Sequence, residues 1–145
     1  MFNNILVPID GSPLSYKPVA AAIEMAKTRQ GRLVLLCVAE PRLFNASDEE
    51  SLAAGAAVEQ QHAAKARSNL TGAIEAARQA GVTCEPLVMQ SRLPCDEIVA
   101  VARRANCDAI FMATRGKMGL LDQLFDESTT RQVLQKTTVP VLVFP

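Results

Sequence analysis

Five short apolar runs, rich in β-branched residues, most constrain how this chain can fold. They span residues 5–9, 33–38, 82–89, 109–113 and 139–144. The runs lack the strict polar–apolar alternation of strands that have one face in water. Apolar strands of this kind are typical of parallel sheets covered on both faces. The sequence therefore predicts a sheet buried between layers of helix.

Segments with helical spacing of their apolar residues separate these runs. We expect helices at about 14–29, 58–80, 96–105 and 128–135, and loops at 41–52 and 114–126, the first of them mobile. Alternating strands and helices predict right-handed crossovers. The whole chain, 1–145, thus reads as one α/β domain with an open, mostly parallel five-stranded sheet and helices on both faces.

Charge and cysteine usage exclude several classes of partner. The chain has 15 Lys and Arg against 15 Asp and Glu, so no net charge attracts nucleic acid or anionic lipid. Neither a secretory signal nor a membrane-spanning apolar stretch is evident. The four cysteines stand in separate segments, as expected for reduced, buried or half-buried thiols. We expect a cytoplasmic protein without nucleic-acid or membrane partners.

Residues suited to ligand binding follow three of the expected strands. Asp10-Gly11-Ser12 follows the first, Val38-Ala39-Glu40 ends the second, and a basic, glycine-containing segment, 114–119, follows the fourth. In an open parallel sheet these carboxyl ends converge where ligands bind. A carboxylate, an apolar edge and a basic loop would suit a nucleotide, with the start of the last helix adding donors. Alternatively, 10–12 is only a turn and helix cap, and 114–119 is a solvated loop; the residues alone leave both readings open.

Three motifs resemble one known family along nearly the whole chain. ILVPIDGS at 5–12, AIFMATRG at 109–116 and VPVLV at 139–143 are similar to the opening, middle and closing motifs of universal stress proteins. The resemblance implies a Rossmann-like fold, similar to adenine nucleotide α-hydrolases, with strand order 3-2-1-4-5. It also implies frequent dimers, and membership of either an ATP-binding or a non-binding class.

The resemblance to the ATP-binding class implies a stress-response regulatory module that binds ATP, with magnesium as a candidate companion ion. It implies no catalytic residue and at most slow ATP hydrolysis. The expected nucleotide-binding residues are Pro8, Ile9, Asp10, Ser12, Val38, Met112, Ala113, Arg115, Gly116, Lys117, Gly119, Glu127, Ser128 and Thr129.

The chain departs from the family's nucleotide motif, in which two spaced glycines precede a glycine followed by Ser or Thr. Ala113 stands at the first glycine, whereas Gly116 retains the second. One count puts Asp126 at the third glycine; the count that we prefer puts Glu127 there and Ser128 at the hydroxyl position. Either acid favours the alternative function, a stress protein that binds no nucleotide and acts through dimer and partner surfaces.

Other features bear on catalysis and assembly. Arg92 replaces a further family glycine, and we expect it to be a solvated loop residue or an extra cation beside the pocket. His62 is the only histidine and is expected to face solvent, so triad or zinc hydrolysis has little support. An adenylyl-transferring enzyme would need an additional substrate domain. The last strand, 139–144, is the expected homodimer edge, with pairing centred on 141–143.

Overall fold

The computed structural model contains a five-stranded parallel sheet with the order β3-β2-β1-β4-β5. It describes residues 1–39, 41, 49–114 and 127–145, with the backbone alone at 49–52 and 127–128. The strands are β1 (Asn4–Pro8), β2 (Arg32–Ala39), β3 (Thr83–Gln90), β4 (Ala109–Ala113) and β5 (Val141–Phe144). The helices are the 3-10 turn η1 (Pro13–Tyr16), α1 (Lys17–Arg29), α2 (Glu49–Gln79), α3 (Pro94–Arg104) and α4 (Glu127–Lys136). The expected fold class and strand order are confirmed.

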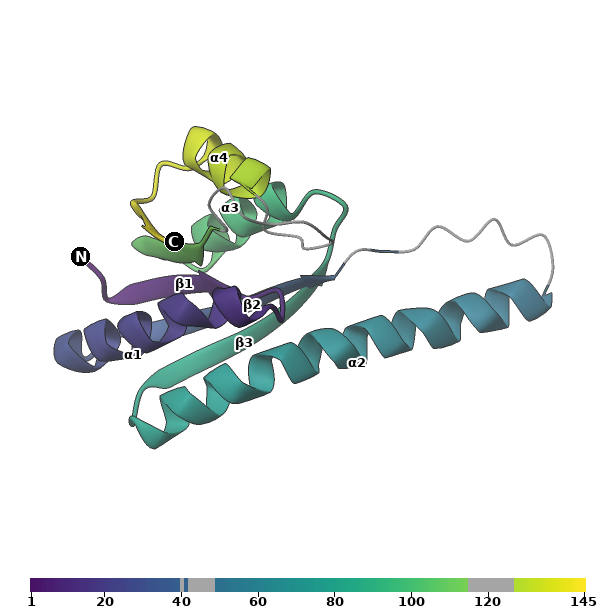
Figure 1. Cartoon of the computed structure of the whole chain (residues 1–145), viewed down its shortest axis with the longest axis horizontal. Coiled ribbons are helices and arrows are strands. Elements are labelled where there is room, and N and C mark those ends of the chain that lie inside the picture. Colours follow the sequence, from purple (N-terminus) through teal and green to yellow (C-terminus); the bar gives the residue numbers. More distant parts are fainter. Residues whose placement is uncertain (40, 42–48, 115–126) are drawn as a thin grey trace.

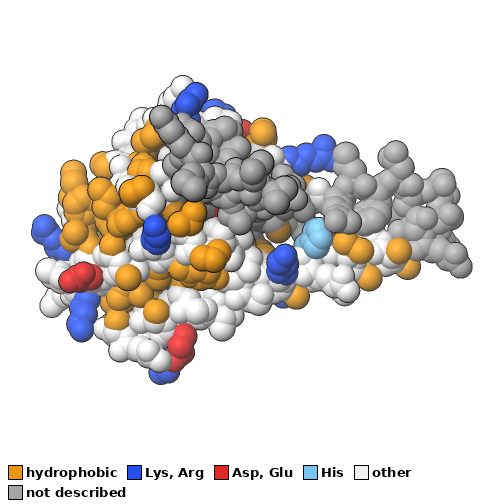
Figure 2. All heavy atoms as spheres, viewed as in Figure 1, with side chains coloured by type: hydrophobic (Ala, Val, Ile, Leu, Met, Phe, Trp, Pro, Cys, Tyr) orange, Lys and Arg blue, Asp and Glu red, His pale blue; other side chains and the backbone are white. Residues whose placement is uncertain are grey.

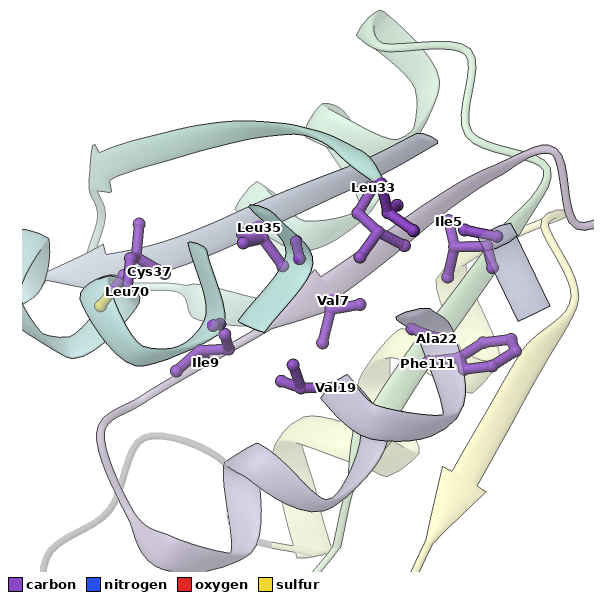
Figure 3. Close-up of a cluster of buried hydrophobic side chains, with 14 of the residues drawn as sticks. Ile5, Val7, Ile9, Val19, Ala22, Leu33, Leu35, Cys37, Leu70 and Phe111 are labelled. Carbon is purple, nitrogen blue, oxygen red and sulfur yellow. The ribbon is translucent and has the colours of Figure 1, made fainter. Parts of the chain in front are cut away.

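The sheet lies between two helical layers, with α1 and α2 on one face and α3 and α4 on the other (Figure 1). Alternate residues of the inner strands enter the two cores. Val7 and Leu35 pack in the layer of α1 and α2, with Val19 and Leu70 (Figure 3). Leu6 belongs to the opposite core, with α3 and α4. The central strand β1 is therefore buried on both faces, as predicted.

The long helix α2 begins earlier than its apolar stripe indicates. It starts at Glu49 rather than at residue 58, so the expected loop over 41–52 is wrong for 49–52. Residues 49–65 are rich in Ala, Glu and Gln, which have high helix propensity even where no stripe faces a core. The part of α2 near its N-terminus extends beyond the sheet (Figure 1), where Ala53 and Ala57 are exposed, whereas Leu70 and Ala77 are buried.

The side chains of the two edge strands, β3 and β5, are more exposed than we expected for a sheet covered on both faces. Along β3, Thr83, Glu85 and Pro86 are exposed. A strand with one neighbour has a free side, and proline is tolerated there because no ladder bond is lost. The last strand begins at Val141 rather than at residue 139, because the Val139 N–H donates to Thr137 Oγ1 (3.0 Å) instead of entering a ladder.

The described cysteines are reduced thiols that are buried to different degrees. Cys37, Cys95 and Cys107 are buried free thiols, and Cys84 is half-buried, as predicted. Of the helices in the described ranges, none is both long and apolar enough to span a lipid bilayer. Basic and acidic side chains are scattered over the described part of the face in Figure 2, without a continuous basic patch there.

Candidate functional site

The strand register brings the carboxyl ends of β1, β2 and β4 to one edge of the sheet. Pro8 lies beside Leu36 in β2, and Leu6 lies beside Ile110 in β4. Pairing with β2 continues past the end of β1, since the Ile9 N–H donates to the Leu36 carbonyl (2.7 Å). The residues expected to bind a ligand at the ends of these strands therefore share this carboxyl edge.

Asp10 and Ser12 form a tight turn directly after β1. The Ser12 N–H donates to Asp10 Oδ1 at 2.8 Å, and between them Gly11 has a φ of 86°, which favours glycine. Ser12 then caps η1, because its Oγ accepts from the Ser15 N–H (3.3 Å). In the described part of the chain, the bond from the Ser12 N–H is the one hydrogen bond to the Asp10 carboxylate. The second carboxylate oxygen, Oδ2, therefore remains available for a ligand.

The apolar members of the predicted site belong to the core at this edge. Pro8 and Ile9 are buried at the end of β1, and Val38 and Met112 are each 0% exposed. Val38 and Met112 pack in the core under α3 and α4. Their side chains therefore support this edge of the sheet from within the core.

The end of β4 is joined to the start of α4. The Thr130 hydroxyl donates to the Ala113 carbonyl at 3.5 Å, and Thr129 and Thr130 are both buried. Ala113, Thr129 and Asp10 thus belong to segments that begin or end at the same edge. The predicted residues Arg115, Gly116, Lys117 and Gly119 lie outside the described residues, as do Asp126 and the side chains of Glu127 and Ser128.

Tyr16 and Asn69 also belong to this site, although the sequence analysis missed both. The Tyr16 hydroxyl donates to the Asn69 backbone carbonyl at 2.6 Å. Asn69 Nδ2 lies 3.5 Å from the Asp10 carbonyl and 4.0 Å from Cys37 Sγ. A Cβ on Gly11 would come within 2.6 Å of the Asn69 side chain. The sequence signal for Asn69 is its position directly beside Leu70 in the apolar stripe of the long helix. That position does not indicate which residue Asn69 contacts.

The Tyr16 and Cys37 side chains, which lie close to this turn, are neutral. Burial raises the pKa of the Tyr16 phenol, and the neighbouring Cys37 and Asp10 side chains raise it further. Burial also raises the pKa of the Cys37 thiol, an effect that the Asn69 amide partly opposes. The Asp10 carboxylate is therefore the charged group that β1 presents at this edge.

Two other predicted features bear on the chemistry. Arg92 is exposed, as expected of a solvated loop residue, and the neighbouring Ser91 N–H donates to the Ala39 carbonyl (3.0 Å). His62 is half-buried rather than fully exposed. Among the described side chains, no three of His, Cys, Asp and Glu gather closely enough to hold a metal ion.

Solved structures place the fold in the Rossmann-like class of open parallel sheets. The chain matches the structure of the hypothetical protein MJ0577 with a TM-score of 0.81 and 22% identity, over 99% of this chain and 95% of that one. It also matches a universal stress protein of Archaeoglobus fulgidus in complex with dAMP, with a TM-score of 0.67 and 20% identity over 98% and 97% of the two chains. A third match is a universal stress protein in complex with cAMP (TM-score 0.63, 19% identity, 98% and 95% covered).

The family is shown by sequence as well. The model of the universal stress protein family matches residues 1–145, and the chain belongs to that family. It is 31% identical to the universal stress protein YxiE of Bacillus subtilis over 151 residues, covering 99% of each. It is 32% identical to the universal stress protein Sll1654 of Synechocystis over 149 residues, covering 100% of this chain and 87% of the relative.

Proposed function

We propose that this universal stress protein is a regulatory module that binds ATP at the carboxyl edge of its sheet. The Asp10 carboxylate carries the proposal. Its Oδ1 is fixed by the Ser12 N–H, which leaves Oδ2 to accept from a ribose hydroxyl or an exocyclic amine. Complexes of dAMP and of cAMP with proteins of the same fold support an adenine nucleotide as the ligand.

The phosphates would lie toward the start of α4 and the segment before it. The N-terminus of a helix favours anions because its first N–H groups have no partners within the helix. Thr129 and Thr130 in the first turn of α4 are buried at the end of β4. Arg115, Lys117, Gly116 and Gly119 would supply charge and close backbone approach, with magnesium as the candidate counter-ion for the phosphates. No residue is assigned a catalytic role, and any hydrolysis would be slow.

We further propose that the module is a homodimer joined through β5. β5 has β4 on one side only, and Leu142 is 47% exposed. An exposed apolar edge strand offers unpaired backbone groups to a second chain. Free thiols at all four cysteines accord with the reducing cytoplasm, which is the location that we propose.

Co-purification tests the proposed ligand. Protein from cells would be denatured and the released small molecules identified by mass spectrometry, beside calorimetric titration of nucleotide-free protein with ATP and with GTP. We expect released adenine nucleotide and tighter binding of ATP than of GTP. Absence of any saturable nucleotide binding would overturn the proposal and favour the alternative, a module that acts through its dimer and partner surfaces alone.

A further inference from the structure

An opening lies between the second half of α3 and the connection from α4 to β5. It arises because α4 ends at the level of the first turn of α3, where Lys136 Nζ contacts Asp96 Oδ1 (2.6 Å). One turn earlier in α4, Gln132 Oε1 accepts from the Cys95 thiol (3.0 Å). Beyond Lys136 none of the helices that the structure describes flanks α3, and the segment 137–140 runs to β5 in its place (Figure 1).

This opening is a cavity of about 270 Å³, which we call the amino-edge cavity because it adjoins the residues just before β4 and β5. Its apolar lining comes from Val99, Ala102, Cys107 and Val139, and its polar lining from Arg103, Asn106, Thr137 and Thr138. Ala102 and Cys107 are buried, whereas Arg103, Asn106 and Thr138 are exposed. The buried side chains of Ala102 and Cys107 thus form the floor of the cavity, and exposed polar side chains form its rim.

Hydrogen bonds fix both sides of the rim. On the α3 side, Asn106 has a φ of 53° and the Cys107 N–H donates to the Ala102 carbonyl (2.8 Å). On the other side, the Thr137 N–H donates to the Val133 carbonyl (2.9 Å), and the Ile110 N–H to the Pro140 carbonyl (2.8 Å). A rim held in this way is formed before a ligand arrives, which reduces the entropy lost on binding.

Arg103 supplies a positive charge to the cavity. Its guanidinium forms no ion pair with any described side chain. The next residue, Arg104, is paired with Glu97 at 2.9 Å. The acids around the cavity are also engaged. Asp96 pairs with Lys136, Glu85 pairs with Arg32 (3.7 Å), and Asp108 accepts from the Asn3 N–H (2.9 Å) and the Asn4 N–H (3.1 Å). The Arg103 guanidinium is therefore available to an anionic ligand.

We propose that the amino-edge cavity binds a small carboxylate that carries a short apolar chain. The carboxylate would accept paired hydrogen bonds from Arg103, and the chain would cover Val99, Ala102 and Val139. Guanidinium and carboxylate groups match in geometry, so two parallel hydrogen bonds can form between them. The cavity is smaller than most drug-sized sites, so the ligand is small. The site lies at the opposite edge of the sheet from Asp10 and does not depend on nucleotide binding.

Titrations monitored by NMR of the backbone amides test this site with four probes. We expect hexanoate to give saturable shifts centred on Ala102, Asn106, Cys107 and Val139. Hexanol, which lacks the charge, and acetate, which lacks the chain, should each bind at least about tenfold more weakly. Inorganic phosphate should give no saturable shift there, because an apolar floor adds nothing to a bare anion.

Two neighbouring arginines provide matched variants. Arg103→Gln should weaken hexanoate binding by about tenfold, whereas Arg104→Gln, which removes a charge outside the cavity, should leave it unchanged. Equal weakening by the two variants would indicate a general charge effect and overturn the proposal. So would hexanoate shifts scattered over the surface, phosphate binding as tight as that of hexanoate, or an unchanged affinity in Arg103→Gln.

Discussion

The Tyr16 hydroxyl lies 2.6 Å from the backbone carbonyl of Asn69 and donates a hydrogen bond to it. This bond joins the segment after β1 to the middle of α2. Asn69 also occupies the space that a side chain on Gly11 would need. The conformation of the turn that carries Asp10 therefore depends on where α2 lies against the sheet.

Gly11→Ala should lower the free energy of unfolding by at least about 1 kcal/mol, because a φ of 86° strains an alanine and its Cβ would meet Asn69. In an Asn69→Ala background the loss should be smaller, since only the backbone strain remains. Urea unfolding of the four proteins measures this difference. Gly72→Ala, with nothing within 4 Å of its Cβ in α2, is the control and should stabilise slightly. Equal losses in both backgrounds would contradict the contact.

Asp10→Asn should weaken ATP binding by about 1 to 3 kcal/mol, because the ligand loses a charged acceptor while an amide oxygen can still accept from Ser12. Asp10→Ala should weaken binding at least as much and also loosen the turn. Calorimetry measures both, with the exposed Glu24→Gln as a charge control. Unchanged affinity in Asp10→Ala with an intact fold would make Asp10 a turn residue only.

Glu127→Gly should strengthen metal-free ATP binding by at least about tenfold, and added magnesium should strengthen binding by the unmodified chain. The family places a glycine N–H against phosphate at this position, and two negative charges about 4 Å apart repel by roughly 4 kcal/mol at an effective dielectric of about 20. A bridging magnesium ion would reverse that effect. Calorimetric titrations of both proteins with ATP, in the presence of magnesium and of chelator, test these expectations. Tight metal-free binding by the unmodified chain would show that the acid does not oppose the phosphates.

Leu142→Lys should convert the proposed dimer into a monomer in light scattering, because it places a charge on the apolar edge of β5. Leu134→Lys is the matched control: Leu134 is similarly exposed, at 51%, but lies on α4 away from the ladder. The control should retain the dimer. A Leu142→Lys protein that stays dimeric would exclude this interface.

Stability should decrease between about pH 9 and pH 11. Burial raises the pKa of the Cys107 thiol from its ordinary 9.0 to about 11, so the unfolded chain ionises first and folding becomes less favourable as the pH rises. Below pH 9 both states are protonated, and the stabilising difference is fully present. Cys107→Ala should reduce the decline measured by urea unfolding at successive pH values. Cys84→Ala, which removes a half-buried thiol, should reduce it less, and identical declines in the parent and Cys107→Ala would contradict the assignment.

The sequence allowed prediction of the elements wherever one physical signal dominated. The apolar runs identified β1, β2 and β4 as strands, since burial on both faces leaves few polar positions. Strand order was implied by the family resemblance, because apolar runs do not say which strands are neighbours. The start of α2 was missed because residues 49–57 have helix propensity but no apolar stripe.

The candidate site was predicted only in part. Asp10 and Ser12 follow directly from their position at the end of an inner strand. The contact of Tyr16 with Asn69 joins residues 53 apart in sequence, and it depends on the rotation of α2 about its axis, which no local pattern determines. Val38 and Met112 lie near the carboxyl ends of their strands, and their complete burial depends on how α3 and α4 pack over them.

The position of β1 in the middle of the sheet has a consequence for synthesis on the ribosome. On one side Ile5 and Leu6 pair with β2, and on the other side they pair with Ala109 and Ile110 of β4, which are synthesised about a hundred residues later. While the chain is shorter than this, β1 is itself an edge strand, with apolar side chains and unpaired backbone groups open to other nascent chains. Newly made chains that stall before β4 should therefore need a chaperone, and chains that have passed it should not.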